Sequence, residues 1–384
     1  MARIVVIAGE PSGDVLGASF IESARRLYPD ATFEGIAGPA MREAGCKVWF
    51  DCQDLAVMGL FEVLRHLPRL LRIKREVERR LLADPPDVLL GIDAPDFNLR
   101  IEKMARKAGI PTVHYVCPSV WAWRESRVKV LRKACDHILC LLPFEPAFLA
   151  GHGIKGEFVG HPLADEISGD VDQAQARQQL GISGSKVLTL MPGSRSGEVQ
   201  RVAPELIRTA AWLNERVTDF SVVVPIARAE LRPEIEKQFQ TLAPDVQVLF
   251  LDGQAHDAIA AGDAVLLVSG TAALEVMLLK RPMVVAYKLS APSYYVARFL
   301  QAVGLFRAKY MSLPNLLADR PLVSEFLQAE VAAPAMGQEL MSLLEPGLHR
   351  DELVNEFAAL GEQLRCSAGV RSAEAVLRAA GLKP

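Results

Sequence analysis

Residues 3–14 read RIVVIAGEPSGD, and this stretch decides the fold. Its first half, Arg3 to Ala8, is an apolar run rich in β-branched residues and without polar alternation. Such a run is typical of a strand that is covered on both faces in a parallel sheet. A loop of small and polar residues follows from Gly9 to Asp14, and the amphipathic stretch Val15 to Leu27 predicts a helix. Strand, loop and helix in this order are the opening unit of a doubly wound α/β domain.

The same alternation continues through most of the chain. Before the middle of the chain we expect further strands at Val88 to Ile92, Pro111 to Val116 and His137 to Leu142, and helices at Leu60 to Leu82, Phe97 to Lys107 and Arg127 to Ala134. A polar linker ends near Gln179. A second series then follows, with strands at Lys186 to Met191, Ser221 to Pro225, Val246 to Leu251, Ala264 to Val268 and Pro282 to Ala286, and helices near Glu198 to Arg216 and Thr271 to Lys280. The tail from Ala332 to Leu382 is helical by its pattern.

These ranges predict an α/β fold of two Rossmann-like, doubly wound domains that face a cleft, with a helical C-terminal tail. We place the domains at residues 1–165 and 166–345, and we expect the helices of residues 346–384 to pack back on the first domain. Ligands of open α/β sheets bind beyond the carboxyl ends of the strands. The functional residues are therefore expected in loops that follow strands.

Composition and charge exclude several functional classes. The 384 residues are 50% apolar, and 43 basic residues face 46 acidic ones for a net charge of −3, so nucleic-acid binding gains no support. The sequence shows no secretory signal and no run of eighteen apolar residues, so we expect a cytoplasmic protein. Its six cysteines form no C-x-x-C pair, and we predict neither a metal site nor a cofactor.

The loop after the first strand carries Glu10, Ser12, Gly13 and Asp14, which are candidate residues of a substrate cleft. Small residues at a helix start let backbone N–H groups approach a ligand. An ordinary capped turn between a strand and a helix explains the same residues equally well.

A second loop, GIDAPD at residues 91–96, places two carboxylates at the end of another expected strand. Asp93 directly follows the strand and is the better candidate for a general base, although a structural carboxylate is also common at such a place. Asp96 precedes the next expected helix, and capping of that helix explains it.

Two loops of the second series are suited to a diphosphate. Gly193, Ser194 and Arg195 follow one strand, and Gly270, Thr271 and Ala272 follow another. Helix starts favour phosphate, and an arginine adds a planar fork for its oxygens. Glu275, one turn into the second helix, suits the two hydroxyls of a ribose, but a surface helix glutamate is the alternative. Arg195 occupies the place of the serine in G-x-S-x-G, and the D-x-D match at 170–172 lies in the linker, so neither a hydrolase triad nor a metal clamp is expected.

The expected helix Leu60 to Leu82 has an unusual composition. Its seven basic residues outnumber three acidic ones, and Phe61, Leu64, Leu67 and Leu71 lie among them. An apolar face beside excess positive charge suits attachment to an anionic membrane. Packing of that face on the domain's own sheet is the alternative. We expect Pro68 to kink or split the helix.

Seven blocks in order along the chain closely resemble the lipid-A-disaccharide synthase family of Gram-negative bacteria. They are residues 9–14, 91–98, 118–123 (PSVWAW), 142–145 (LPFE), 192–195, 269–275 and 312–317 (SLPNLL). The resemblance implies a GT-B glycosyltransferase that forms a homodimer and attaches peripherally to the cytoplasmic face of the inner membrane. The first domain is then the acceptor- and membrane-associating domain, and the second binds the UDP-sugar.

The implied reaction transfers a sugar from UDP-2,3-diacylglucosamine to the 6-hydroxyl of 2,3-diacylglucosamine 1-phosphate (lipid X), with inversion and a β-1,6 linkage. By position, Asp93 is then the base, Arg195 and Glu275 contact UDP, and Asn315 belongs to the same donor site. Two rivals remain open. One is another GT-B enzyme such as a UDP-N-acetylglucosamine 2-epimerase, and the other is a nucleotide-sugar-binding protein without catalysis.

Overall fold

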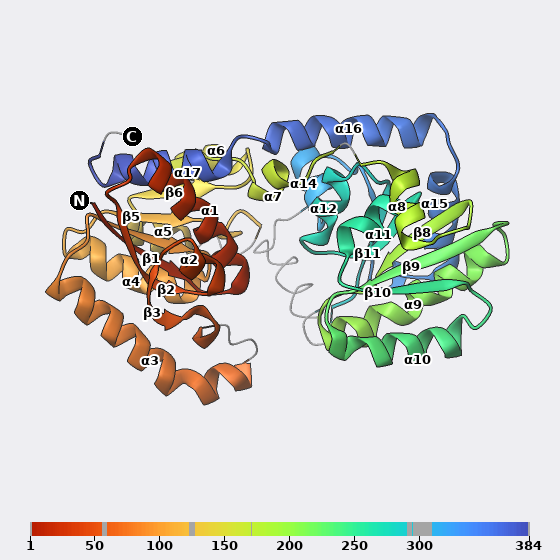
Figure 1. The fold of residues 1–384 in the computed structure, drawn as a ribbon, viewed down its shortest axis with the longest axis horizontal. Helices are drawn as coiled ribbons and strands as arrows, with labels where there is room; N and C mark the ends of the chain where they lie inside the picture. Colours follow the sequence, from red (N-terminus) through yellow and green to blue (C-terminus); the bar gives the residue numbers. More distant parts are fainter. Residues whose placement is uncertain are drawn as a thin grey trace. The chain divides into compact units, whose positions relative to one another are not determined.

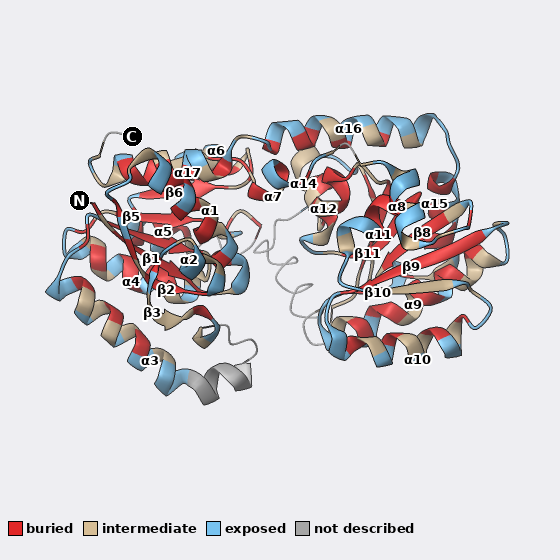
Figure 2. Ribbon diagram, viewed as in Figure 1, coloured by how far each residue is buried: buried red, intermediate tan, exposed pale blue. Residues whose placement is uncertain are grey.

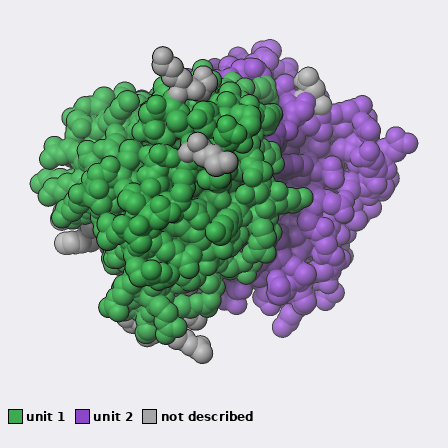
Figure 3. All heavy atoms as spheres, turned by 60° about the vertical axis from the view of Figure 1, so that its left-hand side comes forward, with its two compact units in different colours: residues 1–165, 305–307, 364–384 green, residues 166–304, 308–363 purple. Residues whose placement is uncertain are grey.

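The computed structural model describes residues 2–55, 60–122, 127–169, 171–289, 294 and 309–382, without the side chains of 60–66. It divides the chain into two compact units, coloured separately in Figure 3. One unit contains Met1–Asp165 and Leu364–Pro384, and the other contains Glu166–Gly304 and Ala308–Gln363. The tail is therefore shared between the units, whereas we expected all of residues 346–384 to pack on the first.

The first unit is built on a parallel sheet of seven strands in the order β3-β2-β1-β4-β5-β6-β7 (Figure 1). The strands are β1 (Arg3–Ala8), β2 (Thr32–Ala37), β3 (Lys47–Asp51), β4 (Val88–Ile92), β5 (Thr112–Tyr115), β6 (His137–Cys140) and β7 (Gly156–Phe158). Its helices are α1 (Pro11–Leu27), α2 (Pro39–Glu43), α3 (Leu60–Ala83), α4 (Pro95–Lys107), α5 (Val128–Ala134), α6 (Glu145–Ala150) and α17 (Ala368–Ala379), and α7 (Pro162–Glu166) lies at its boundary.

The second unit repeats this plan with six parallel strands in the order β10-β9-β8-β11-β12-β13. The strands are β8 (Lys186–Met191), β9 (Phe220–Ile226), β10 (Val248–Asp252), β11 (Ala264–Val268), β12 (Met283–Tyr287) and β13 (Ser324–Leu327). The helices are α8 (Gln173–Leu180), α9 (Ser196–Asn214), α10 (Arg232–Leu242), α11 (Ala255–Ala261), α12 (Ala272–Leu278), α14 (Leu313–Ala318), α15 (Ala333–Leu344) and α16 (Leu348–Leu364).

The cores of both units lie along the central strands. All five residues of β4 and all five of β11 are buried. Figure 2 shows the central strand β9 in red, whereas the outer faces of the helices are exposed. Helices on both faces leave no polar side of the sheet, which is why the sequence shows continuous apolar runs there. The prediction of two doubly wound α/β domains with a helical tail is confirmed.

Several sequence-based expectations about single elements were wrong. The expected linker contains α7 and α8, and Asp172 caps α8 by accepting hydrogen bonds from the N–H groups of Ala174 and Gln175. Helix α3 runs through Pro68 without a break, so the proline does not split it, whereas a kink there stays a prediction. The short strands β2, β3, β7 and β13 were not predicted.

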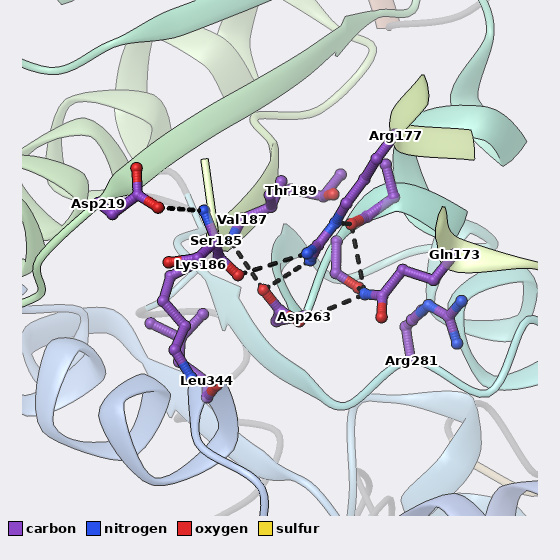
Figure 4. Close-up of polar contacts among 12 residues, drawn as sticks. Gln173, Arg177, Ser185, Lys186, Val187, Thr189, Asp219, Asp263, Arg281 and Leu344 are labelled. Carbon is purple, nitrogen blue, oxygen red and sulfur yellow. Dashed lines mark hydrogen bonds and ion pairs between the residues drawn. The ribbon is translucent and has the colours of Figure 1, made fainter. Parts of the chain in front are cut away.

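A buried carboxylate joins the amino-terminal end of the second sheet to α8 (Figure 4). Oδ2 of Asp263 accepts a hydrogen bond from the N–H of Val187 at 2.8 Å, and the guanidinium of Arg177 lies 2.7 Å from the same oxygen. Gln173 donates to the carbonyls of Ala261 and Gly262 beside it. These bonds position β8 and β11, from which two of the candidate loops leave.

Helix α17 is part of the first unit's core, although it lies at the end of the sequence. It packs against α1, and Val376 and Leu377 are fully buried in the same cluster as β1 and β4. The apolar face of α17 thus completes the hydrophobic core that the first 165 residues begin.

Replacing Leu377 with alanine should lower the free energy of unfolding of the protein by about 2–5 kcal/mol, because a fully buried leucine is truncated to leave a cavity. Urea denaturation measures the change. The matched control is Arg371→Ala on an exposed position of the same helix, which should alter stability by less than about 0.5 kcal/mol. Equal stability of the two variants would show that α17 is not part of the core.

Candidate active site

The candidate loops follow four strands that meet in two pairs. In the first unit β1 pairs with β4, and in the second β8 pairs with β11. At each pair the strand order reverses, so the connections that follow the two strands run to opposite sides of the pair. A crevice for a ligand therefore lies between them, at the carboxyl ends of the strands. The loops that begin at Gly9 and Asp93 are thus neighbours, as are those that begin at Pro192 and Ser269.

The loop at Asp93 has an unusual backbone. Asp93 and Ala94 both have positive φ, +49° and +44°. Each such residue costs on the order of 1–3 kcal/mol and persists where its surroundings hold it. The N–H of Asp93 donates to the carbonyl of Tyr115 at 2.9 Å, and a Cβ added to Gly9 would lie 2.2 Å from the Cβ of Ala94. Only glycine at position 9 lets the two loops approach this closely.

Asp96 does not cap α4. The helix begins at Pro95 with Ala94 as its N-cap residue and without a side-chain cap, so this interpretation of the sequence was wrong. The carboxylate of Asp96 is instead paired with Arg127 at 2.6 Å. Asp93 remains the carboxylate that directly follows β4.

The first loop divides into structural and accessible residues. Asp14 is buried, and its carboxylate accepts hydrogen bonds from the N–H groups of Gly38, Ala40 and Met41 at 2.7–3.1 Å. It therefore fixes the start of α2, and its place in the substrate cleft stays a prediction. Gly13 is also buried, whereas Ser12 is exposed and Glu10 is half-buried.

A buried imidazole lies near Asp93. His114 pairs in register with Gly91, and its Nδ1 lies 2.7 Å from an oxygen of Glu102, whose other oxygen accepts from the Cys135 thiol. Burial alone lowers the pKa of His114, but the charge and hydrogen bond of Glu102 and the charge of Asp93 raise it overall. These hydrogen bonds account for the cluster, and we assign no metal to it.

In the second unit, Arg195 is the N-cap residue of α9. Its guanidinium is largely exposed and lies 2.7 Å from Glu198, one turn into the helix. Gly193 has a φ of +104°, which places the loop in a conformation that glycine adopts without strain. Gly193, Ser194 and Arg195 therefore form a loop whose exposed cation is held by the carboxylate of Glu198, a side chain that is only 14% exposed.

The loop after β11 leaves room beside its helix. Gly270 is exposed, and a Cβ added there would meet no atom within 4 Å, so packing does not require glycine at this position. Thr271 and Ala272 begin α12. Glu275 is paired with His256, which lies 3.2 Å away on α11. Sequence reasoning missed His256, because nothing in its surroundings distinguishes it from other helix residues.

Asn315 is a structural residue. It is buried, and its amide nitrogen donates to Val323 and Glu325 while its oxygen accepts from the N–H groups of Leu322 and Val323. Both ends of the amide are occupied within the protein, and the place of Asn315 in the donor site stays a prediction. The side chain fixes the segment between α14 and β13.

Trp121 and Glu145 form a buried contact in the first unit. The indole Nε1 donates to Glu145 at 3.1 Å, and Phe144 packs edge-on against the ring of Trp121 at 5.0 Å. Burial raises the pKa of Glu145 to about 7, although hydrogen bonds from the Leu142 backbone and Trp121 act in the opposite direction. The contact holds one side chain of the PSVWAW block in place.

Comparisons with known proteins agree with this geometry. A family model described as lipid-A-disaccharide synthetase matches residues 4–376. The lipid-A-disaccharide synthase of Xanthomonas campestris pv. campestris is 46% identical over 376 residues, which cover 97% of this chain and 85% of that protein. Among solved structures, a putative UDP-N-acetylglucosamine 2-epimerase from Listeria monocytogenes has a TM-score of 0.64 at 12% identity, with 98% of this chain and 95% of that chain covered. The calicheamicin glycosyltransferase CalG4 has a TM-score of 0.60 at 17% identity, with 99% and 98% covered.

Trp121 fluorescence should report the titration of Glu145. We expect a transition with a midpoint near pH 7, because ionisation strengthens the hydrogen bond that the indole donates. A carboxyl whose pKa is raised from 4.5 to about 7 also stabilises the folded state fully below pH 4.5 and loses this contribution as the pH rises through 7. Both the fluorescence transition and this part of the stability profile should be absent in Glu145→Gln. Trp121→Phe identifies the emitting ring, and a transition that persists in Glu145→Gln would contradict the assignment.

Proposed function

The chain belongs to the lipid-A-disaccharide synthase family, and from this membership and the loops described above we propose how it carries out its reaction. It is a glycosyltransferase of lipid A biosynthesis with a GT-B fold. It condenses UDP-2,3-diacylglucosamine with 2,3-diacylglucosamine 1-phosphate to give the disaccharide 1-phosphate and UDP. The family match along nearly the whole chain is the observation that carries this conclusion.

Asp93 is the proposed general base. As the 6-hydroxyl oxygen of the acceptor bonds to the anomeric carbon of the donor, its proton passes to the Asp93 carboxylate, and the bond from that carbon to the diphosphate breaks. Attack from the face opposite the leaving group inverts the anomeric centre. The position of Asp93 at the carboxyl end of β4, in a strained loop, supports this role.

The proposed donor site lies on the second unit. Two loops surround the carboxyl ends of β8 and β11. The first contains Gly193, Ser194 and Arg195, and the second contains Gly270, Thr271 and Ala272. When the donor binds, the guanidinium of Arg195 leaves Glu198 and pairs with the diphosphate. It then stabilises the negative charge that develops on the diphosphate as the bond to the sugar breaks. Glu275 accepts hydrogen bonds from the ribose hydroxyls, with His256 orienting its carboxylate.

The proposed acceptor residues are Glu10 and Ser12. The close contact of Gly9 with Ala94 sets the start of their loop beside the loop of Asp93. Neighbouring positions suit one group that binds the acceptor sugar and another that removes its proton. Gly13 contributes the close packing of α1 beneath them.

The epimerase interpretation has weaker support. The putative epimerase from Listeria monocytogenes is 12% identical to this chain, and a likeness at that level shows the fold alone. The 46% identity is to a lipid-A-disaccharide synthase. A nucleotide-sugar-binding protein without catalysis shares the donor loops but needs no base.

Asp93→Asn should keep the size of the side chain and remove the base, so turnover should fall about 10²- to 10⁴-fold. Purified wild type and variant are incubated with both acylated substrates, and products are weighed by mass spectrometry. The wild type should form the disaccharide 1-phosphate and UDP, and UDP affinity of the variant should stay near wild type. An isomer of the UDP-sugar as the product would instead identify an epimerase. Near wild-type turnover of folded Asp93→Asn would contradict the role of Asp93.

We also propose that the protein acts as a homodimer bound peripherally to the cytoplasmic face of the inner membrane, through α3. No helix among the described residues combines the length and apolar character needed to cross a bilayer. On α3, Ile73, Val77 and Leu81 are buried in the unit's own core, so the second half of the helix packs on the sheet. Leu67 and Leu71 remain 39% and 37% exposed, while the side chains of Phe61 and Leu64 lie outside the described residues.

The exposed side of α3 is basic. Arg72, Arg75 and Arg79 line a pocket of about 400 Å³ together with Pro68 and Glu76. Basic side chains next to exposed leucines match an anionic surface with an apolar interior, and each basic residue contributes about 1 kcal/mol near such a surface. The acylated substrates reside in membranes, so this attachment brings the enzyme to them.

Replacing both Leu67 and Leu71 with serine should release the protein from anionic liposomes, because two exposed apolar side chains are lost. Flotation measures the bound fraction, and thermal melts run in parallel measure folding. The matched control is Leu348→Ser, which changes a leucine that is 82% exposed in the other unit. Unchanged binding of the double variant would place the membrane contact elsewhere, and a lowered melting temperature would indicate that these leucines support the fold.

A further inference from the structure

We propose that Asn98 is a positioning residue for the reaction: its side-chain amide joins the carboxyl ends of β1 and β4 and holds Asp93 in its left-handed conformation. The inference rests on the proposed role of Asp93 as the base. Asn98 is in the first turns of α4 and is completely buried, so it does not itself touch a substrate.

The amide nitrogen of Asn98 is shared among three backbone carbonyls. It donates to Ile92 at 3.1 Å and to Asp93 at 2.8 Å, which are the last residue of β4 and the residue after it. It also donates to Ile7 of β1 at 3.2 Å. One side chain thus links both strands of the pair at which the strand order reverses.

Asp93 and Ala94 need such a link. Two successive non-glycine residues with positive φ do not hold this conformation unless the surrounding structure enforces it. Asn98 is the side chain that reaches the carbonyl of Asp93, and therefore acts on the peptide group that joins these two residues. Without it the Asp93 carboxylate is free to turn away, and a displacement of about 1 Å is enough to slow catalysis on the order of 10²-fold.

The contacts of Asn98 are confined to one end of its amide. The Asn98 oxygen is buried and has no hydrogen-bond partner among the described residues. Buried polar atoms are satisfied in the great majority of cases, as both ends of Asn315 are. The hydrogen bonds that Asn98 forms within the described residues therefore all run from its amide nitrogen to the ends of the two strands.

The first test compares Asn98→Leu, which keeps a similar volume without a donor, with Leu99→Ala, which truncates a buried neighbour on α4 that forms no bond to the loop. We expect kcat of Asn98→Leu to fall 10- to 100-fold, with KM for both substrates within twofold of wild type. Leu99→Ala should keep kcat within threefold at a temperature where it is folded. Asn98→Ser, which retains one donor, should give an intermediate kcat, and it replaces Asn98→Leu if the latter does not fold. Equal effects of the Asn98 and Leu99 changes on kcat would overturn the proposal.

A second comparison separates this inference from the proposed function. If Asn98 acts through Asp93, then Asn98→Leu should cost less than threefold in kcat when added to Asp93→Asn, because the base is already lost. The same factor in both backgrounds would show that Asn98 acts independently of Asp93 and would reject its positioning role. Near wild-type turnover of Asp93→Asn alone would reject the base itself, and with it the premise of the inference.

Discussion

The reversal of strand order at β1 and β4, and again at β8 and β11, is the constraint on which the rest of the structure depends. Adjacent parallel strands whose connections leave to opposite sides keep their carboxyl ends uncovered. The first pair can be used only because Gly9 lets its loop approach Ala94, where any side chain would clash. The proposed base, the acceptor loop and the donor loops all lie at these two positions.

Most interior strands were predictable from sequence, whereas three of the four edge strands, β3, β7 and β13, and the interior strand β2 were not. Strands such as β4 and β11 are buried on both faces, so every residue is apolar or small and the run is continuous. In contrast, β3 and β13 have no fully buried residue, and their polar and apolar side chains mix without a clear period. Such an edge strand forms through hydrogen bonds to the backbone of a neighbouring strand, which lies elsewhere in the sequence, so its own residues carry little signal. The loops after β1, β4, β8 and β11 could be found because the strands before them were found.

The roles of single residues required the structure. Asp14 looks like a loop carboxylate open to a ligand, but its three N–H partners lie 24 to 27 residues further along the chain. Asn315 is similar, since its bonds to Val323 and Glu325 use every position of the amide. The carboxylate of Glu275 on α12 pairs with the imidazole of His256 on α11. Sequence gives the chemical type of each group, whereas its availability is decided by partners that only the fold brings near.

Buried polar side chains of this protein therefore differ in what they do. The side chains of Asp14 and Asn315 form hydrogen bonds with backbone groups. Asp14 fixes the start of α2, and Asn315 fixes the segment between α14 and β13. By contrast, the Asn98 oxygen and the Nε2 of His114 are buried without a partner among the described residues. Atoms of this kind also occur in Ser221 and Gln238, so such an atom does not by itself mark a functional residue. What distinguishes Asn98 is where its donor contacts lead, because one of them ends on the backbone of Asp93, the proposed base. A buried polar side chain is therefore assigned to the reaction by the segment that it holds, and not by a partner that one of its atoms lacks.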